Sequence, residues 1–483
     1  MKLIKNYIYY TLYQVISLIV PLILNPYITR VLTKDAIGIY SYVNSITQII
    51  IIIGLLGLNT YSIREIAKVR ENEKEVAILF KGFLLMRIFI CCLLIIGVIL
   101  FLIIANTEYN VYFMINFILI IANFIDISYY YTGIENMKKV VIKNTLIKLS
   151  SVILIVCFIK NDNDLFLYFI INSFSTLLGS LLMFKSLPKN IFQYRIKNIS
   201  EFNYIFHIKQ SLKIFVPQIA SQVYVSIDKI MIGLFLIMDS LAIYEKSEQI
   251  AKMPISIITA LSTIMMPRIA NEIENKNNNN VRKLMNFSIE FVFLIMIPIM
   301  FGLIAISNEF IPLYLGKEYI DAIFPFQLFC LLIFPISISS VFGNQYLVAK
   351  GKTKILSISY FTAALINIIL NVIFLNYIGM IGAIYSTIIA ECIVAIIQFI
   401  YVKNVLDKHL IAKFFISIAS ATLMSIIVTS FNFGFSWIAI FIKVFIGIII
   451  YYVCLIVLSL NIIKFDIIQI SIKYLKNIIV PDK

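Results

Sequence analysis

Long apolar runs of about 20 residues follow one another along the whole chain, separated by short polar and basic segments. A transmembrane α-helix needs a run of about this length, and unbroken apolarity favours helices over the alternating pattern of a membrane β-barrel. The pattern therefore predicts an all-α integral membrane protein with fourteen spans. The expected spans are residues 7–29, 36–62, 79–104, 111–132, 142–160, 165–185, 211–236, 247–267, 285–306, 323–348, 355–376, 380–402, 411–431 and 435–461.

One stretch of this pattern occurs twice. Residues 32–67 carry a polar corner, an apolar run and a charged exit, and residues 236–270 repeat that order 204 positions later. Four pairs of identical residues flank the two runs: Asp35 and Asp239, Ile39 and Ile243, Tyr40 and Tyr244, and Arg64 and Arg268. The shared order indicates an internal duplication, with a transport pathway expected between the two copies.

The duplication predicts two pseudo-symmetric six-helix lobes followed by two C-terminal helices. We expect an N-lobe at residues 1–185, a cytoplasmic linker at 186–210, a C-lobe at 211–403, and two helices with a cytoplasmic tail at 404–483. The linker interleaves basic and aromatic residues, which is typical of an amphipathic segment on an anionic leaflet. RNA binding is the alternative for such a segment, and we expect no nucleic-acid partner.

Composition and charge agree with this picture. The 483 residues are 61% hydrophobic and 13% charged, which excludes a soluble globular protein. The net charge of +15 comes from basic residues between the apolar runs. With the N-terminus inside, cytoplasmic segments hold 28 Lys and Arg against 5 on the other side. The positive-inside rule therefore predicts that both termini are cytoplasmic.

Ionisable residues inside the runs are the main functional signal, because an unpaired charge in a membrane helix is costly. Arg87, Asp126 and Lys148 are expected at a similar depth in three helices of the N-lobe. Their net positive charge predicts a cationic surface in a water-filled cavity, suited to a phosphate. The alternative is an Arg87–Asp126 ion pair that only stabilises the lobe.

Further charges extend the candidate sites. Glu248 and Lys252 have the i,i+4 spacing of a helical ion pair. Arg64 and Arg268 end matched helices, as positive-inside anchors or at the inward mouth of a pathway. The candidate substrate-binding residues are Arg87, Lys148, Arg64, Arg268, Lys229 and Lys252. The candidate ion-coupling or gating residues are Asp126, Asp228, Glu391 and Glu290.

Signatures of enzymes and of cofactor sites are absent from the sequence. The segment Lys350 to Thr353 imitates the end of a P-loop, but Tyr346 stands where the first glycine is required. The sequence predicts no catalytic residue, no metal site, no ATP site and no other cofactor. Without an ATP site, energy for transport would come from a gradient, such as one of protons or sodium, or from the substrate itself.

Several motifs together resemble the Wzx-type polysaccharide-unit flippases of the multidrug/oligosaccharidyl-lipid/polysaccharide exporter superfamily. They are TRVLTKDAIGIYSYVNSITQI (29–49), LGLNTYSIREIA (56–67), VPQIASQVYVSIDKIMIG (216–233), ALSTIMMPRIA (260–270), EFIPLYLGKEY (309–319) and NQYLVAKGK (344–352). The resemblance implies two six-helix lobes with a cationic cavity and two extra helices. It also implies transport of undecaprenyl-pyrophosphate-linked oligosaccharide from the inner to the outer leaflet of a bacterial inner membrane.

Alternating access of the lobes is the expected mechanism, and O-antigen or capsule polymerase and chain-length proteins of the same pathway are the expected partners besides the lipid bilayer. Three other functions remain open. A multidrug antiporter or a lipid II flippase belongs to the same superfamily, whereas a membrane glycan polymerase or ligase would be an enzyme.

Overall fold

The computed structural model describes residues 16, 19–105, 108–188, 190–193 and 202–459. The chain divides into two compact units, Met1–Ala242 and Ile243–Lys483. In the described residues every regular element is a helix. Eleven of these helices are long and apolar enough to span a membrane, or twelve if one bent pair forms a single span. The protein is therefore a helical multi-pass membrane protein.

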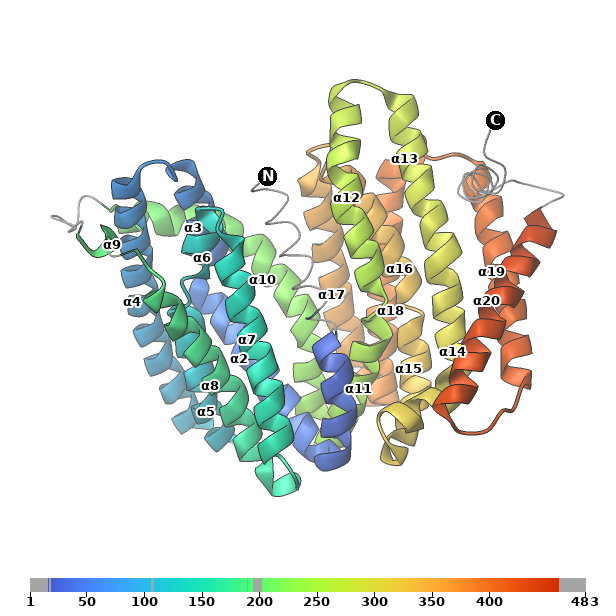
Figure 1. Cartoon of the computed structure of the whole chain (residues 1–483), viewed down its shortest axis with the longest axis horizontal. Helices are drawn as coiled ribbons and strands as arrows, with labels where there is room; N and C mark the ends of the chain where they lie inside the picture. The colour runs from blue at the N-terminus through green and yellow to red at the C-terminus, as the bar shows by residue number, and fades with distance from the viewer. Residues whose placement is uncertain (1–15, 17–18, 106–107, 189, 194–201, 460–483) are drawn as a thin grey trace, which may run out of the picture. The chain divides into compact units, whose positions relative to one another are not determined.

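The first unit begins with a short apolar helix, Ile19–Val31. The elements that follow are α2 (Lys34–Leu55), α3 (Leu58–Lys68), α4 (Glu73–Ala105), α5 (Asn110–Phe124), α6 (Ser128–Gly133), α7 (Met137–Phe158), the 3₁₀ helix η1 (Asp162–Asp164), α8 (Leu165–Lys185), α9 (Asn190–Gln193) and α10 (Tyr204–Phe235). In this unit α5 and α7 pack on α8, while α10 packs along α2 and α3 (Figure 1).

Two predicted spans of this unit are interrupted. The run at 36–62 forms α2 and α3, because Leu56 and Gly57 adopt left-handed φ angles of 48° and 76° between them. A left-handed residue cannot continue a right-handed helix. The run at 111–132 likewise forms α5 and α6, with Ile125, Asp126 and Ile127 between the two helices. Each interruption frees backbone groups and redirects the side chains around it.

Close backbone packing joins α2 to the end of the unit. A Cβ on Gly38 would lie 2.0 Å from the backbone oxygen of Met238, and one on Gly233 would lie 2.3 Å from the ring of Tyr42. Only glycine allows these approaches. The two glycines therefore fix how closely α2 approaches α10 and the segment after it.

The boundary between the two units lies within α11 (Met238–Lys252), which begins in the first unit and continues into the second. The further elements of the second unit are α12 (Ile255–Glu274), α13 (Asn278–Phe291), the π-helix η3 (Val292–Met296), α14 (Ile297–Tyr314), the 3₁₀ helix η4 (Lys317–Ala322), α15 (Ile323–Cys330), α16 (Ile333–Ser339), the π-helix η5 (Ser340–Leu347), α17 (Thr353–Ile378), α18 (Met380–Val402), the 3₁₀ helix η6 (Lys403–Val405), α19 (His409–Ser430) and α20 (Trp437–Ser459).

Helix pairs organise this unit. α17 packs along α18, and α14 packs on α19 and α20 (Figure 1). α11 and α12 are bent by 45° at the short break between them, so the predicted span 247–267 is bent rather than straight. Both π-helices lie within predicted spans, at Val292–Met296 and Ser340–Leu347. Such π segments interrupt the regular hydrogen-bond ladder and often accompany functional sites.

Most predicted spans match a helix in the described part of the chain. Residues 7–15 and 17–18 of the first expected span and 460–461 of the last lie outside the described residues, as do residues 189 and 194–201 of the expected linker. α10 begins at Tyr204, seven residues before its predicted start, because Asn203 caps it by accepting a hydrogen bond from the Phe206 amide at 3.0 Å.

Candidate functional site

Arg87 is the centre of a polar cluster inside the first unit. Its side chain projects from α4 and is fully buried. Nη1 donates to the backbone oxygen of Asp126 at 3.0 Å, and Nη2 donates to Oδ1 of Asn59 at 2.6 Å. The guanidinium also lies over the ring of Tyr129, with Cζ 4.0 Å from the ring centroid. A buried cation is thereby held by an amide, a carbonyl and an aromatic face.

The Asp126 carboxylate is held separately. It accepts hydrogen bonds from the Ser128 amide at 3.0 Å, from Oγ of Ser128 at 2.7 Å and from Nζ of Lys143 at 2.9 Å. The break between α5 and α6 exposes the Ser128 amide for this contact, because a residue at the start of a helix has no helical acceptor. The Arg87–Asp126 ion pair, which the sequence left as the alternative, does not form between the side chains: the carboxylate pairs with Lys143 instead.

The open side of the cluster lies at the start of α3. Asn59 and Thr60 are exposed, whereas Leu58 and Tyr61 on either side are buried. Gln218 in α10 donates from Nε2 to Oγ1 of Thr60 at 2.7 Å. A chain of contacts therefore runs from buried Arg87 to exposed uncharged polar groups.

The other candidates of the first unit lie in varied surroundings. Lys148 in α7 is half-buried and lies five residues after Lys143. Asp228 in α10 is buried, and Lys229 beside it is half-buried. Arg64 in α3 is exposed, with 66% of its side-chain surface accessible and Nε 3.9 Å from Glu65. The structure brings Arg87 and Asp126 into contact, but Asp126 meets Lys143 rather than Lys148.

Sequence reasoning missed Lys143 and Asn59. Lys143 is the second residue of the predicted span 142–160, where a lysine is usually an interfacial anchor. Its place in the cluster follows from α7, which begins at Met137, so that Lys143 is already within the helix. Asn59 carries no charge, and its role depends on the break at Leu56 and Gly57. Only the glycine pair Gly54 and Gly57 around that break signalled it in the sequence.

Charged residues of the second unit form their own pairs. Glu290 in α13 is fully buried and pairs with Lys413 in α19. The expected pair of Glu248 and Lys252 is present, with 2.7 Å between Nζ and Oε1. Glu391 in α18 is buried and Arg268 in α12 is exposed. These side chains belong to several helices of the unit, and Glu290 is the deepest of them.

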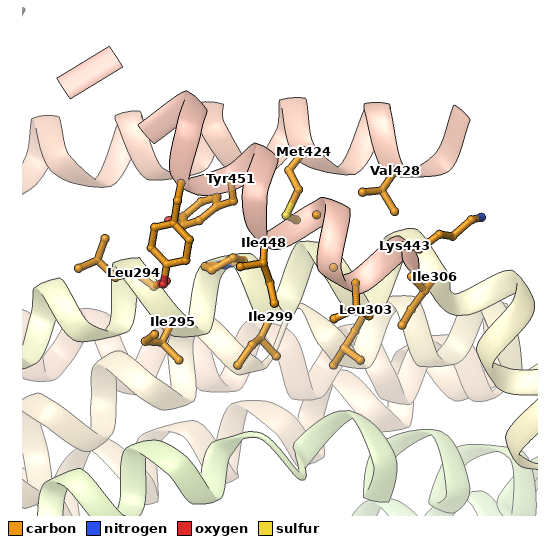
Figure 2. A pocket seen from close by; sticks show the side chains of 15 residues that line it. Leu294, Ile295, Ile299, Leu303, Ile306, Met424, Val428, Lys443, Ile448 and Tyr451 are labelled. Atoms are coloured by element: carbon orange, nitrogen blue, oxygen red, sulfur yellow. The ribbon is translucent and has the colours of Figure 1, made fainter. Parts of the chain in front are cut away.

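An apolar pocket of about 360 Å³ lies between α14, α19 and α20 of the second unit (Figure 2). Aliphatic side chains such as Ile299, Leu303 and Ile448 line it, and Lys443 is its single charged lining residue. Lys443 Nζ donates to Oε1 of Glu309 at 2.6 Å. The pocket is therefore suited to hydrocarbon rather than to a polar group.

A second polar contact of the first unit lies before the apolar run 211–236. Nδ1 of His207 lies 2.8 Å from the hydroxyl of Tyr61, and the imidazole stacks on Phe202 with 4.3 Å between ring centroids. Burial lowers the pKa of His207, and the nearby Glu65 carboxylate partly offsets this. The neutral imidazole is therefore favoured at this position.

Comparison with known proteins gives two family matches. A family model described as "Polysaccharide biosynthesis protein" matches residues 3–273, which is more than half of the chain. A second model, described as "Lipid II flippase MurJ", matches residues 144–453.

Individual relatives match over most of their length. The chain is 23% identical to a "Putative O-antigen transporter" of Shigella dysenteriae, over 83% of this chain and 100% of that protein. Its fold is similar to a structure of the lipid II flippase MurJ in an inward closed conformation, with a TM-score of 0.74, 19% identity, and coverage of 95% and 100% of the two chains. It is also similar to an inward-facing multidrug MATE transporter, with a TM-score of 0.61, 14% identity, and coverage of 83% and 95%.

Proposed function

Because the chain belongs to the polysaccharide biosynthesis protein family, within a superfamily that includes MurJ and MATE transporters, we propose that it is a flippase for lipid-linked oligosaccharides. The family is one of transporters and not of enzymes, so a polymerase or ligase activity is discarded. The observation that carries the proposal is the similarity to an O-antigen transporter over that protein's full length.

The polar cluster of the first unit supports this function. A pyrophosphate and a sugar chain cannot cross hydrocarbon without polar groups that replace water. Arg87 and Lys143 carry two positive charges against the single negative charge of Asp126. The surplus positive charge favours an anionic headgroup, and exposed Asn59 and Thr60 add uncharged hydrogen-bonding groups beside it.

The finer parts of the proposal follow from the sequence. We propose fourteen spans in two six-helix lobes plus two helices, and alternating access of these lobes in a bacterial inner membrane with both termini cytoplasmic. The substrate would be undecaprenyl-pyrophosphate-linked oligosaccharide. Arg87, Lys148, Arg64, Arg268, Lys229 and Lys252 would bind it, and Asp126, Asp228, Glu391 and Glu290 would serve coupling or gating. Arg87 would then act through Asn59, because its own guanidinium is buried.

A deletion strain tests the function. Without the protein, lipid-linked oligosaccharide should accumulate on the cytoplasmic leaflet and the surface glycan should be lost. Periplasmic enzymes that trim or ligate the glycan report which leaflet holds it. Expression of the wild-type chain should restore both readouts, and the Arg87→Glu variant should not. Normal glycan display in the deletion strain would contradict the proposal.

Transport of lipid II is the second candidate, favoured by the match of the MurJ family model to residues 144–453. The two functions differ in the glycan and in the phenotype. A lipid II flippase should rescue cells depleted of their own, whereas an oligosaccharide flippase should restore only the surface glycan. A multidrug antiporter would instead change drug sensitivity and leave both glycans unaltered.

A further inference from the structure

The start of α3 presents uncharged hydrogen-bonding groups just after the candidate membrane span Lys34–Leu55. Leu56 and Gly57 end α2, and α3 begins at Leu58 without a side-chain cap at Gly57. A Cβ on Gly57 would lie 2.7 Å from the backbone oxygen of Ser211 and 2.9 Å from the amide of Phe215. The glycine therefore lets the backbone of α10 approach the break, and Gln218 lies about one turn further along α10.

Asn59 is oriented by Arg87. Nη2 of the guanidinium donates to Oδ1 of Asn59 at 2.6 Å, and a guanidinium can only donate. The amide oxygen must therefore face Arg87, so the Nδ2 group points away from it. In the described part of the chain, Arg87 is the only side chain that hydrogen-bonds to Asn59. The Nδ2 group of this exposed residue is thus a donor held in one orientation.

Arg87 is itself held by both of its terminal nitrogens and by its face, while Nε has no hydrogen-bond partner among the described residues. Nη1 donates to the backbone oxygen of Asp126 at 3.0 Å, and the plane lies on the ring of Tyr129. The carboxylate of Asp126 is anchored by Ser128 and Lys143. Three helices and the α5–α6 break therefore support the orientation of one amide group. Such support is characteristic of a preorganised binding group rather than of a surface asparagine.

Thr60 and Gln218 complete the same exposed edge. Nε2 of Gln218 donates to Oγ1 of Thr60 at 2.7 Å, which leaves the threonine hydroxyl proton to donate and Oε1 of Gln218 to accept. The edge thus offers two donors and an acceptor without net charge. Polar groups facing hydrocarbon would be costly, so this exposed edge after the span Lys34–Leu55 faces water or substrate.

We propose that Asn59, Thr60 and Gln218 bind hydroxyl groups of the sugar next to the lipid carrier, with Arg87 as the positioning residue. Hydroxyls both donate and accept, and they match an edge of uncharged amides and a hydroxyl. A phosphate bound at this edge would need cations that reach it directly, whereas Arg87 is buried behind Asn59 and attracts the headgroup only through its charge. This inference rests on the proposed oligosaccharide flippase function and names the part of the substrate that these residues recognise.

Binding to the purified full-length protein in lipid nanodiscs tests it. The two probes are polyprenyl pyrophosphate and the same lipid carrying a disaccharide. Asn59→Leu should weaken binding of the disaccharide-bearing lipid about fivefold to tenfold and leave the bare lipid within about twofold. The matched control is Asn376→Leu, which replaces an exposed asparagine in α17 whose Nδ2 donates to the Val372 oxygen and should leave both probes unchanged.

Two further conservative variants distinguish sugar binding from phosphate binding at this edge. Their side chains are close in shape to the native ones, so the fold should be preserved. Asn59→Asp keeps an acceptor for Arg87 and offers its second oxygen to a hydroxyl, so binding of the disaccharide-bearing lipid should stay within about threefold of wild type. A phosphate partner would be repelled, so loss of both probes in this variant overturns the proposal. Thr60→Val, which preserves shape, should weaken only the disaccharide-bearing lipid, by about threefold to fivefold.

The positioning role of Arg87 has its own readout. Arg87→Lys cannot hold Asn59 and the Asp126 carbonyl together, so it should reduce the preference for the disaccharide-bearing lipid. The double variant with Asn59→Leu should lose no further preference, because both changes remove the same contact. Additive losses would contradict the positioning role.

Different experimental results would contradict the sugar-binding assignment and the flippase function. If the wild-type protein binds neither probe and the deletion strain displays normal glycan, the flippase function is wrong. If the wild-type protein binds both probes and Asn59→Leu and Thr60→Val bind them equally well, the sugar-binding assignment alone is wrong.

Discussion

Glu290 in α13 and Lys413 in α19 form an ion pair whose side chains are 0% and 8% exposed. Glu290 lies two residues before the π-helix Val292–Met296, and Lys413 lies in the first turns of α19. The pair therefore joins α13 to α19 at the point where the α13 hydrogen-bond ladder changes its spacing.

Removing one partner of this pair should destabilise the second unit. Glu290→Leu leaves the buried ammonium of Lys413 without its counter-charge, which costs about 3–5 kcal/mol. The double variant Glu290→Leu with Lys413→Met should recover most of this loss, since no buried charge remains. Thermal unfolding of the purified protein measures both effects.

The control for this prediction is the exposed pair of Arg282 and Asp407, whose side chains are 49% and 43% accessible. Arg282→Ala should cost less than about 1 kcal/mol because water and ions screen the pair. An equal loss of stability in Glu290→Leu and Arg282→Ala would show that burial does not decide the strength of these pairs.

Lys143 and Lys148 should differ in what their removal changes. Lys143→Met takes a 2.9 Å contact from the Asp126 carboxylate and should lower the free energy of unfolding by about 1–3 kcal/mol, together with transport. Lys148→Met tests the sequence-based assignment and should reduce transport with little change in stability. Thermal unfolding and surface-glycan display distinguish the two. Unchanged stability in Lys143→Met would be inconsistent with the cluster described here.

His207 should make stability fall as the pH is lowered. Burial holds the pKa of His207 below its usual value, so the unfolded chain takes up the proton first as the pH falls through about 6.5. This contribution to stability is complete above that pH and decreases below it, until the folded state is also protonated. His207→Gln should flatten the dependence of the melting temperature on pH between about 7 and 5.

His409 provides a matched control, since it is exposed and is the other of the two histidines in the chain. His409→Gln should leave the pH dependence as in wild type. If His207→Gln retains the full dependence, His207 is not the group responsible for it.

Gly38 and Gly97 should respond oppositely to alanine. The new Cβ at residue 38 would lie 2.0 Å from the Met238 oxygen, and a backbone atom cannot rotate away. Gly38→Ala should therefore destabilise the first unit by at least about 1–3 kcal/mol. Gly97 lies within α4 with no atom within 4 Å of a new Cβ, so Gly97→Ala should be neutral or stabilising by up to about 1 kcal/mol. Similar expression and melting temperatures for the two variants would refute this.

The helices were predictable from sequence because a membrane-spanning helix needs an apolar run of about 20 residues, and such runs are visible in the sequence. The interruptions were less predictable. Leu56 adopts a left-handed conformation that leucine rarely takes, and nothing in its residue type signals this. The bend between Lys252 and Ile255 and the π-helix after Phe291 likewise depend on packing against neighbouring helices.

The sequence identified individual charged residues of the candidate site, but it did not identify the residues that they contact. Arg87 and Asp126 were identified because a charge within an apolar run is rare, and they do meet. Which atoms meet depends on the backbone: the Asp126 carbonyl, left open by the end of α5, accepts from Arg87, while its carboxylate turns to Lys143. Uncharged Asn59 gave no comparable signal.

Because of the break at Leu56 and Gly57, the rotation of α3 about its axis does not depend on the number of residues in α2. In an unbroken helix, inserting one residue into the α2 half would rotate Asn59 by about 100° away from Arg87. Here α3 takes its orientation from α4, α6 and α10, on which it packs. An insertion or deletion of one residue ahead of Leu56 should therefore leave the amide of Asn59 facing its guanidinium.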